Sequence, residues 1–168
     1  MTEKYPLAKA AQDAEKAENA AKSLTWWDDN GQPRRKNVFS FLGQPLPWSE
    51  FKNARDLKRR LEKLEDSKRT AVIRKLLMNY ALYAKAEKDR REKGKNRKAD
   101  GKPQTLYGPW NWRIVYLLRR TFGKDSEKAN PNEQALITDF HTRPDMLEYT
   151  GVAARWAELL KRDSQDKE

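Results

Sequence analysis

The segment EFKNARDLKRRLEKLE, residues 50–65, carries an apolar side chain at every third or fourth position. These side chains are Phe51, Ala54, Leu57, Leu61 and Leu64. That spacing places them along one side of an α-helix, while the intervening lysines and arginines fall on the other sides. The segment therefore predicts an amphipathic helix with one buried face and a strongly basic exterior.

Further helices are predicted on the C-terminal side of this segment. The next runs from Ser67 to about Lys93, because its apolar residues keep the same spacing. Another begins at Gly108-Pro109 and ends at Gly123, since proline suits the first helical turn and glycine the left-handed stop. Shorter helices are expected near 132–140 and over 145–162, with Gly151 as a candidate break in the last one.

On the N-terminal side, residues 6–24 are rich in Ala, Lys and Glu and predict one more helix. Residues 25–47 hold a turn signal at 28–31 and an aromatic run at 38–42, which together favour a short hairpin or an irregular loop. The fold class expected is mainly α: a small helical bundle of about five helices, with a short aromatic hairpin or irregular loop after the first helix.

A chain of 168 residues fits a single helical domain, 1–168. Within it we expect residues 1–5, 94–105 and 163–168 to be mobile, because the two ends and the Gly- and Lys-rich middle segment lack apolar positions with which to dock.

The net charge of +11 is concentrated in the middle of the chain. Residues 51–100 hold 18 basic and 8 acidic side chains, whereas residues 1–50 hold 7 of each and residues 101–168 hold 11 and 10. Concentrated charge of one sign creates a local field that attracts a polyanion. The distribution therefore favours DNA or RNA as a partner.

Several classes of protein are disfavoured by composition. The chain has no cysteine, so disulfides and thiolate metal sites are excluded. It has no apolar run long enough for a membrane span and no apolar N-terminal leader, so we expect no membrane association and a cytoplasmic protein. His141, the only histidine, has no partner at metal-ligand or nucleophile spacing. We therefore expect no enzyme activity, no catalytic residue, no metal and no cofactor.

The main candidate for nucleic-acid binding is a group of cations where the helices over 50–65 and 67–93 meet. Phosphates favour flexible cations that share one surface, because each neutralised phosphate releases counterions. The alternative is an ordinary solvated helix exterior. The group comprises Lys58, Arg59, Arg60, Lys68, Arg69, Arg74 and Lys75. The basic segment 93–102, with Lys95, Arg97 and Lys98, is a second candidate, equally explained as a solvated linker.

The helix predicted over 108–123 interleaves aromatic and basic residues. Arg113, Arg119 and Arg120 could contact phosphates, and exposed aromatic rings beside them could stack on unpaired bases. For Trp110 and Trp112 we favour the alternative, which is a place in the core, because tryptophan at helical spacing is usually buried.

A second aromatic and basic group lies near the N-terminus. Trp26 and Trp27 are adjacent, so in a regular strand they would point to opposite sides and one could be exposed as an anchor for a partner. Arg34 and Arg35 follow closely. The alternative is a bent loop in which both tryptophans are covered.

These features support two main functional hypotheses. The first is a non-enzymatic accessory or regulatory protein that binds DNA or RNA through phosphates, alone or as a subunit of a larger nucleoprotein complex. The second is a protein-interaction module, an adaptor or inhibitor, whose aromatic segment anchors an acidic partner protein that the basic residues attract. An enzyme of unfamiliar chemistry is a third and weaker hypothesis. The sequence does not distinguish DNA from RNA, or single from double strands.

Overall fold

The computed structural model describes residues 7–27, 32–92, 108–123 and 130–165. These residues form six α-helices, one short 3-10 helix and two small antiparallel sheets, so the predicted mainly α fold is confirmed. In chain order the elements are α1 (Leu7–Ser23), β1 (Trp26–Trp27), β2 (Pro33–Arg34), β3 (Val38–Phe41), β4 (Gln44–Pro47), α2 (Trp48–Glu62), α3 (Asp66–Glu92), α4 (Gly108–Phe122), α5 (Pro131–Thr142), η2 (Pro144–Met146) and α6 (Leu147–Gln165).

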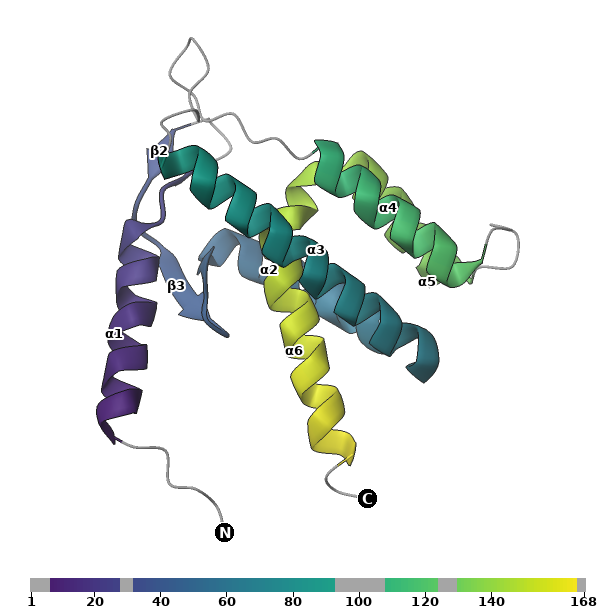
Figure 1. Ribbon diagram of the computed structural model, residues 1–168, viewed down its shortest axis with the longest axis horizontal. Helices are drawn as coiled ribbons and strands as arrows, with labels where there is room; N and C mark the ends of the chain where they lie inside the picture. Colours follow the sequence, from purple (N-terminus) through teal and green to yellow (C-terminus); the bar gives the residue numbers. More distant parts are fainter. Residues whose placement is uncertain (1–6, 28–31, 93–107, 124–129, 166–168) are drawn as a thin grey trace. The chain divides into compact units, whose positions relative to one another are not determined.

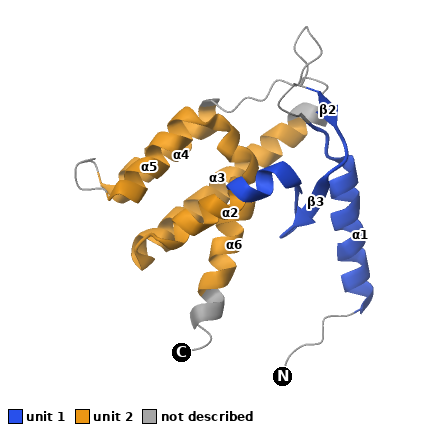
Figure 2. Cartoon of the chain, turned by 180° about the vertical axis from the view of Figure 1, so that it is seen from behind, with its two compact units in different colours: residues 1–53 blue, residues 54–168 orange. Residues whose placement is uncertain are grey.

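The chain separates into two compact units, residues 1–53 and 54–168 (Figure 2). The first contains α1, the four strands and the start of α2, and the second contains the rest of α2 and all later helices. The single domain expected from the sequence stays a prediction.

In the first unit, the aromatic segment forms the predicted hairpin. Strands β3 and β4 pair antiparallel, with Val38 opposite Pro47 and Phe41 opposite Gln44. The two residues between the strands, Leu42 and Gly43, both have positive φ angles, of 52° and 78°. Two successive positive φ angles are the mark of the tight two-residue turn whose twist matches that of paired strands. Figure 1 shows the sheet beside α1.

An aromatic cluster, defined as Phe39, Phe41, Trp48 and Phe51, joins this hairpin to the start of α2. The ring of Trp48 stacks on Phe39 with the centroids 4.0 Å apart, and Phe51 meets both rings edge to face. Such contacts stabilise an aromatic pair beyond the area that it buries. The Trp48 amide, at the first residue of α2, also donates to the carbonyl of Asn37 at 2.9 Å.

In the second unit, α3 packs against both α4 and α6, and α4 packs along α5 (Figure 1). The apolar stripe predicted on α2 is buried at Ala54, Leu57 and Leu61. The remaining helices complete a core of aliphatic and aromatic side chains. Its largest fully buried members are Tyr149, Phe140, Leu61, Leu76, Ile114, Leu118, Leu136 and Leu147.

The last helix differs from expectation at two points. Helix α6 passes through Gly151 without a break and continues to Gln165, beyond the expected end at Arg162. Gly151 is buried, as are Val152, Ala153 and Ala154 beside it. A single glycine costs a helix about 1 kcal/mol relative to alanine. Close packing of this face offsets that cost.

Candidate nucleic-acid interface

Five of the predicted phosphate-binding residues, here called the junction cations, lie where α2 and α3 meet: Lys58, Arg59, Arg60, Lys68 and Arg69. Two of them tie these helices to α5. The Nη1 of Arg60 lies 2.6 Å from Oδ2 of Asp139, and the Nζ of Lys68 lies 3.0 Å from Oε1 of Glu133. Ion pairs between helices stabilise the packing of those helices, so Arg60 and Lys68 have a structural role.

The other three junction cations are paired with carboxylates of α2 or α3. Lys58 lies 2.9 Å from Glu62 and also stands over the ring of Trp156, at 5.1 Å. Arg59 approaches Asp56 at 3.7 Å, and Arg69 pairs with Asp66. The junction therefore mixes both signs of charge, and its surface is less basic than the sequence count suggests.

Among the carboxylates that pair with the junction cations, Glu133 is the one that is fully buried. It forms hydrogen bonds through both of its carboxylate oxygens. Its Oε2 accepts from the backbone N–H of Asn130 at 3.2 Å, and the side chain of Asn130 accepts from the N–H of Glu133 at 2.9 Å. This reciprocal pair is a capping box that fixes the start of α5. The hydrogen bond from Lys68 to Oε1 raises the pKa of that lysine above its ordinary value.

The remaining two predicted cations of α3 lie further along the helix. Arg74 is exposed, and the Nζ of Lys75 donates to Oγ1 of Thr121 on α4 at 2.6 Å. Lys75 therefore contacts α4 at Thr121, the residue that follows Arg120.

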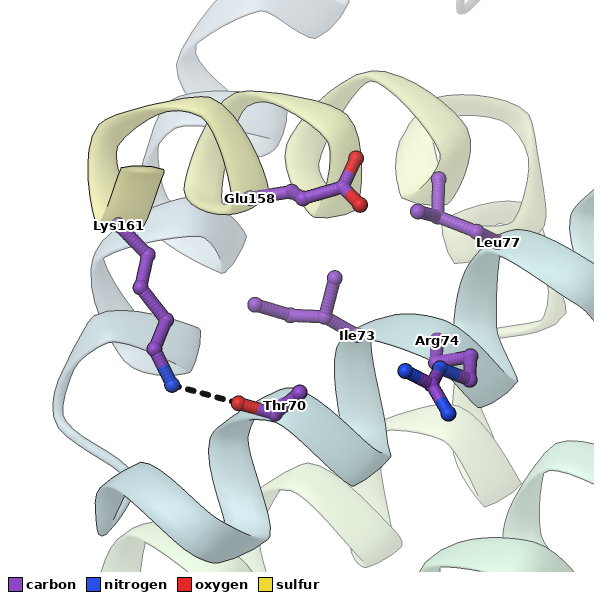
Figure 3. Close-up of a pocket in the computed structure, with 6 residues that line it drawn as sticks. All are labelled: Thr70, Ile73, Arg74, Leu77, Glu158 and Lys161. Carbon is purple, nitrogen blue, oxygen red and sulfur yellow. Dashed lines mark hydrogen bonds between the residues drawn. The ribbon is translucent and has the colours of Figure 1, made fainter. Parts of the chain in front are cut away.

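Arg74 also borders a small open pocket between α3 and α6 (Figure 3). Ile73 and Leu77 form its floor, and Lys161 donates to Thr70 across it at 2.5 Å. Glu158, on the same side as Lys161, pairs with Arg155. Because the lining carries both signs of charge in a shallow, partly apolar hollow, the pocket offers no concentrated site for an anion.

Helix α4 gives the clearest departure from expectation. Ile114, Leu118 and Phe122 are buried as the apolar spacing requires, but Trp112 is 71% exposed. The core position favoured for Trp112 is therefore wrong, whereas Trp110 is half-buried. Tyr116, one turn after Trp112, is 51% exposed, and the two rings are nearly parallel, at 7°, with centroids 6.4 Å apart.

The three predicted arginines of α4 lie on the same side as these rings. Arg113, Arg119 and Arg120 are all exposed. With 3.6 residues in each turn, the five positions fall within an arc of about 120° around the helix. We call this set the α4 face: Trp112, Arg113, Tyr116, Arg119 and Arg120.

Within the described ranges, the charge of the α4 face has no ion-pair partner. The sequence of α4 contains no Asp or Glu. Among the residues that the structure describes, none forms an ion pair with Arg113, Arg119 or Arg120. This contrasts with the junction cations, each of which has a carboxylate partner. The α4 face thus presents three guanidinium groups and two aromatic rings together.

The structure gives less information about the other predicted site residues. Lys95, Arg97 and Lys98 lie outside the described residues. In the first unit, Arg34 and Arg35 are exposed, while Trp26 is half-buried and its indole N–H donates to the carbonyl of Lys36 at 2.9 Å. Trp27 pairs with Pro33 in the β1–β2 ladder, and its side chain lies outside the description.

Sequence reasoning missed two exposed aromatic residues. Trp48 is 57% exposed although it stacks on Phe39, and Trp112 was assigned to the core. A signal was present for Trp112: counted at 100° per residue, it falls opposite Ile114 and on the same side as Arg119. The sequence gives no comparable signal for Trp48, which lies where a strand meets a helix.

Metal-binding groups and membrane-spanning helices also help to define the kind of site. Among the described residues, no group of three or more His, Cys, Asp or Glu side chains could hold a metal ion. In the same ranges of the chain, no helix is both long and apolar enough to cross a membrane. Comparison with models of known protein families, with curated protein sequences and with solved structures gives no match.

Proposed function

We propose that this protein is a non-enzymatic nucleic-acid-binding protein, with an accessory or regulatory role, that contacts phosphates through a basic helical surface. One observation carries the proposal: the α4 face holds three exposed arginines without a carboxylate on the same helix. Exposed, unpaired guanidinium groups form bidentate hydrogen bonds with phosphate oxygens. The proposal includes a cytoplasmic location, alone or within a larger nucleoprotein complex.

The sequence favoured the α2–α3 junction as the main phosphate-binding surface, whereas we propose α4. The junction cations contact Glu62, Asp56, Asp139, Glu133 and Asp66, and a phosphate would have to displace those carboxylates. Among the described residues, no carboxylate would have to be displaced from the arginines of α4. Lys75 also contacts α4, through Thr121, but Arg74 borders the pocket between α3 and α6, so neither residue is included in the proposed surface.

Fluorescence anisotropy with labelled DNA and RNA, titrated over a range of salt, tests the proposal. The variant Arg113→Gln, Arg119→Gln, Arg120→Gln should bind at least tenfold more weakly, because each lost phosphate contact removes a counterion-release contribution. A matched control, Lys9→Gln, Lys16→Gln, Lys22→Gln, removes the same charge from α1, where the lysines pair with Asp13 or Glu18. Equal affinity losses in the two variants would contradict a specific role for α4.

The second candidate function is a protein-interaction module, and the aromatic cluster of the first unit favours it. Trp48 and Leu42 are both exposed in the first unit, as are the cations Arg34 and Arg35. Exposed tryptophan with arginine is typical of the residues that dominate protein interfaces. An acidic partner would complement this charge.

Trp48→Ala separates the two functions. It should abolish a complex with a partner protein that survives high salt and nuclease treatment, and it should leave nucleic-acid affinity within about twofold. Loss of nucleic-acid binding in this variant would instead place both activities on one surface. Circular dichroism of the variant checks that the hairpin and α2 remain folded.

A further inference from the structure

We infer that the α4 face binds unpaired bases, so that its ligand is single-stranded DNA or RNA. The inference rests on the proposed function and specifies the ligand class. It starts from Trp112 and Tyr116, which expose most or half of their surface on a helix that buries Ile114, Leu118 and Phe122. Phosphate binding alone does not require either ring.

The geometry of the two rings suits base stacking. Their planes are within 7° of parallel, and their centroids lie 6.4 Å apart along one side of α4. Aromatic side chains bind single strands by stacking on base faces, and this works for every base because each has a π-face. Arg113, next to Trp112 in the chain, adds a planar guanidinium group that can also stack.

The order of the residues along α4 supports the same ligand. The arginines alternate with the rings: Arg113 lies between Trp112 and Tyr116, and Arg119 and Arg120 lie one turn beyond Tyr116. At 1.5 Å per residue, the distance from Arg113 to Arg120 is about 10 Å along the axis. A short stretch of strand could therefore place bases on the rings and phosphates on the arginines.

A duplex would use this surface poorly. Its base faces are stacked inside the helix, and only groove edges and phosphates are accessible to a protein. The arginines would gain contacts with a duplex, but the two rings would gain little. The rings therefore predict a preference for single strands that the charge alone does not.

The test compares one labelled oligonucleotide as a single strand and as a duplex, in DNA and RNA form, at fixed salt. The variant Trp112→Ala, Tyr116→Ala should bind the single strand at least tenfold more weakly and the duplex within about twofold of the unmodified protein. The matched variant Trp112→Phe, Tyr116→Phe keeps both rings and should restore single-strand affinity to within about threefold.

A second measurement reads stacking directly. A single strand containing 2-aminopurine, whose fluorescence falls when the base stacks, should lose fluorescence on binding the unmodified protein and the Phe variant. The Ala variant should leave the fluorescence of the bound strand largely unchanged. This signal does not depend on affinity when binding is saturated, so it separates loss of stacking from general weakening.

The outcomes distinguish the inference from the proposed function. If the protein binds single strand and duplex equally, and the Ala variant matches the unmodified protein, the inference is overturned while nucleic-acid binding stands. If no oligonucleotide binds even at low salt, both fail, and the exposed rings and arginines of α4 become a surface for a protein partner.

Discussion

At the scale of single residues, Glu133 shows how a charged group is accommodated in this core. The carboxylate is fully buried, but one oxygen accepts from the Asn130 backbone and the other from Lys68. The same side chain thus completes the cap of α5 and links that helix to α3. A buried charge without such partners would cost several kcal/mol.

We predict that Glu133→Ala lowers the free energy of unfolding by about 2 kcal/mol, because it removes one half of the capping box and leaves the backbone N–H of Asn130 unsatisfied. Urea denaturation followed by circular dichroism measures this change. Glu65→Ala is the control, since Glu65 approaches the same lysine at 3.6 Å but its side chain is 69% exposed. It should cost less than about 0.5 kcal/mol. Equal losses would contradict the structural importance of burial here.

Lys68 also predicts a dependence of stability on pH. Its pKa in the folded protein is raised, chiefly by the hydrogen bond to Glu133, above the ordinary value of 10.5. A raised pKa contributes stability that is fully present below 10.5 and is lost as the pH rises through the folded value. The stability difference between the unmodified protein and Lys68→Met should therefore stay constant up to about pH 10 and shrink as the pH rises beyond 10.5. A constant difference beyond that pH would argue against the pair.

At the scale of secondary structure elements, α4 combines two faces with opposite roles. Its buried side supports the second unit through Ile114, Leu118 and Asn111, whose side-chain amide donates to the carbonyl of Phe140 at 2.8 Å. The α4 face contributes little to that packing. Stability and binding should therefore respond to different substitutions on one helix.

We predict that Trp112→Ala changes the free energy of unfolding by no more than about 0.5 kcal/mol, because the ring is mostly in solvent. Leu118→Ala on the opposite side should cost about 2–5 kcal/mol, through lost burial and the cavity left behind. Thermal or urea unfolding of the two variants compares them directly. A loss of more than about 1.5 kcal/mol for Trp112→Ala would show that the ring packs in the folded protein.

The limits of helix α4 follow from its sequence, whereas its orientation depends on what surrounds it. Pro109 and Gly123 were sufficient to predict its beginning and end, and Gly123 has the expected positive φ, of 107°. Ile114 and Leu118 are buried four residues apart, as apolar residues at helical spacing on one side of a helix are. Trp112 was misassigned because the general preference of tryptophan for the core outweighed its angular position, which agreed with exposure.

At the scale of the whole molecule, the distribution of charge in sequence differs from its distribution in space. The basic excess of residues 51–100 suggested a surface at the α2–α3 junction. Two acidic residues of α5 compensate part of it: Asp139 contacts Arg60 across 79 residues, and Glu133 contacts Lys68 across 65. Contacts between residues so distant in the chain follow from tertiary packing, which local spacing does not predict. The arginines of α4 lie in a segment, residues 101–168, whose charge is nearly balanced in sequence. The charge count of that segment therefore does not indicate that they gather on one side of the helix.

The salt dependence of binding should report how many arginines of α4 contact phosphate. For single strands, the slope of log K against log salt is about −0.7 for each phosphate neutralised. Replacing Arg113, Arg119 and Arg120 with Gln should therefore reduce the magnitude of the slope by about 2. Anisotropy titrations at several salt concentrations give both slopes. An unchanged slope with weaker affinity would mean that these arginines act without meeting phosphate.

The cations of the α4 face are all arginine, and the sequence of α4 contains no lysine. Guanidinium groups do not react with the acylating reagents that modify primary amines. Coupling the protein to a bead or a dye through its amines should therefore leave this surface chemically untouched. In a cell, acetylation of lysines could lower the overall charge of the protein without altering the groups that we expect to hold the strand.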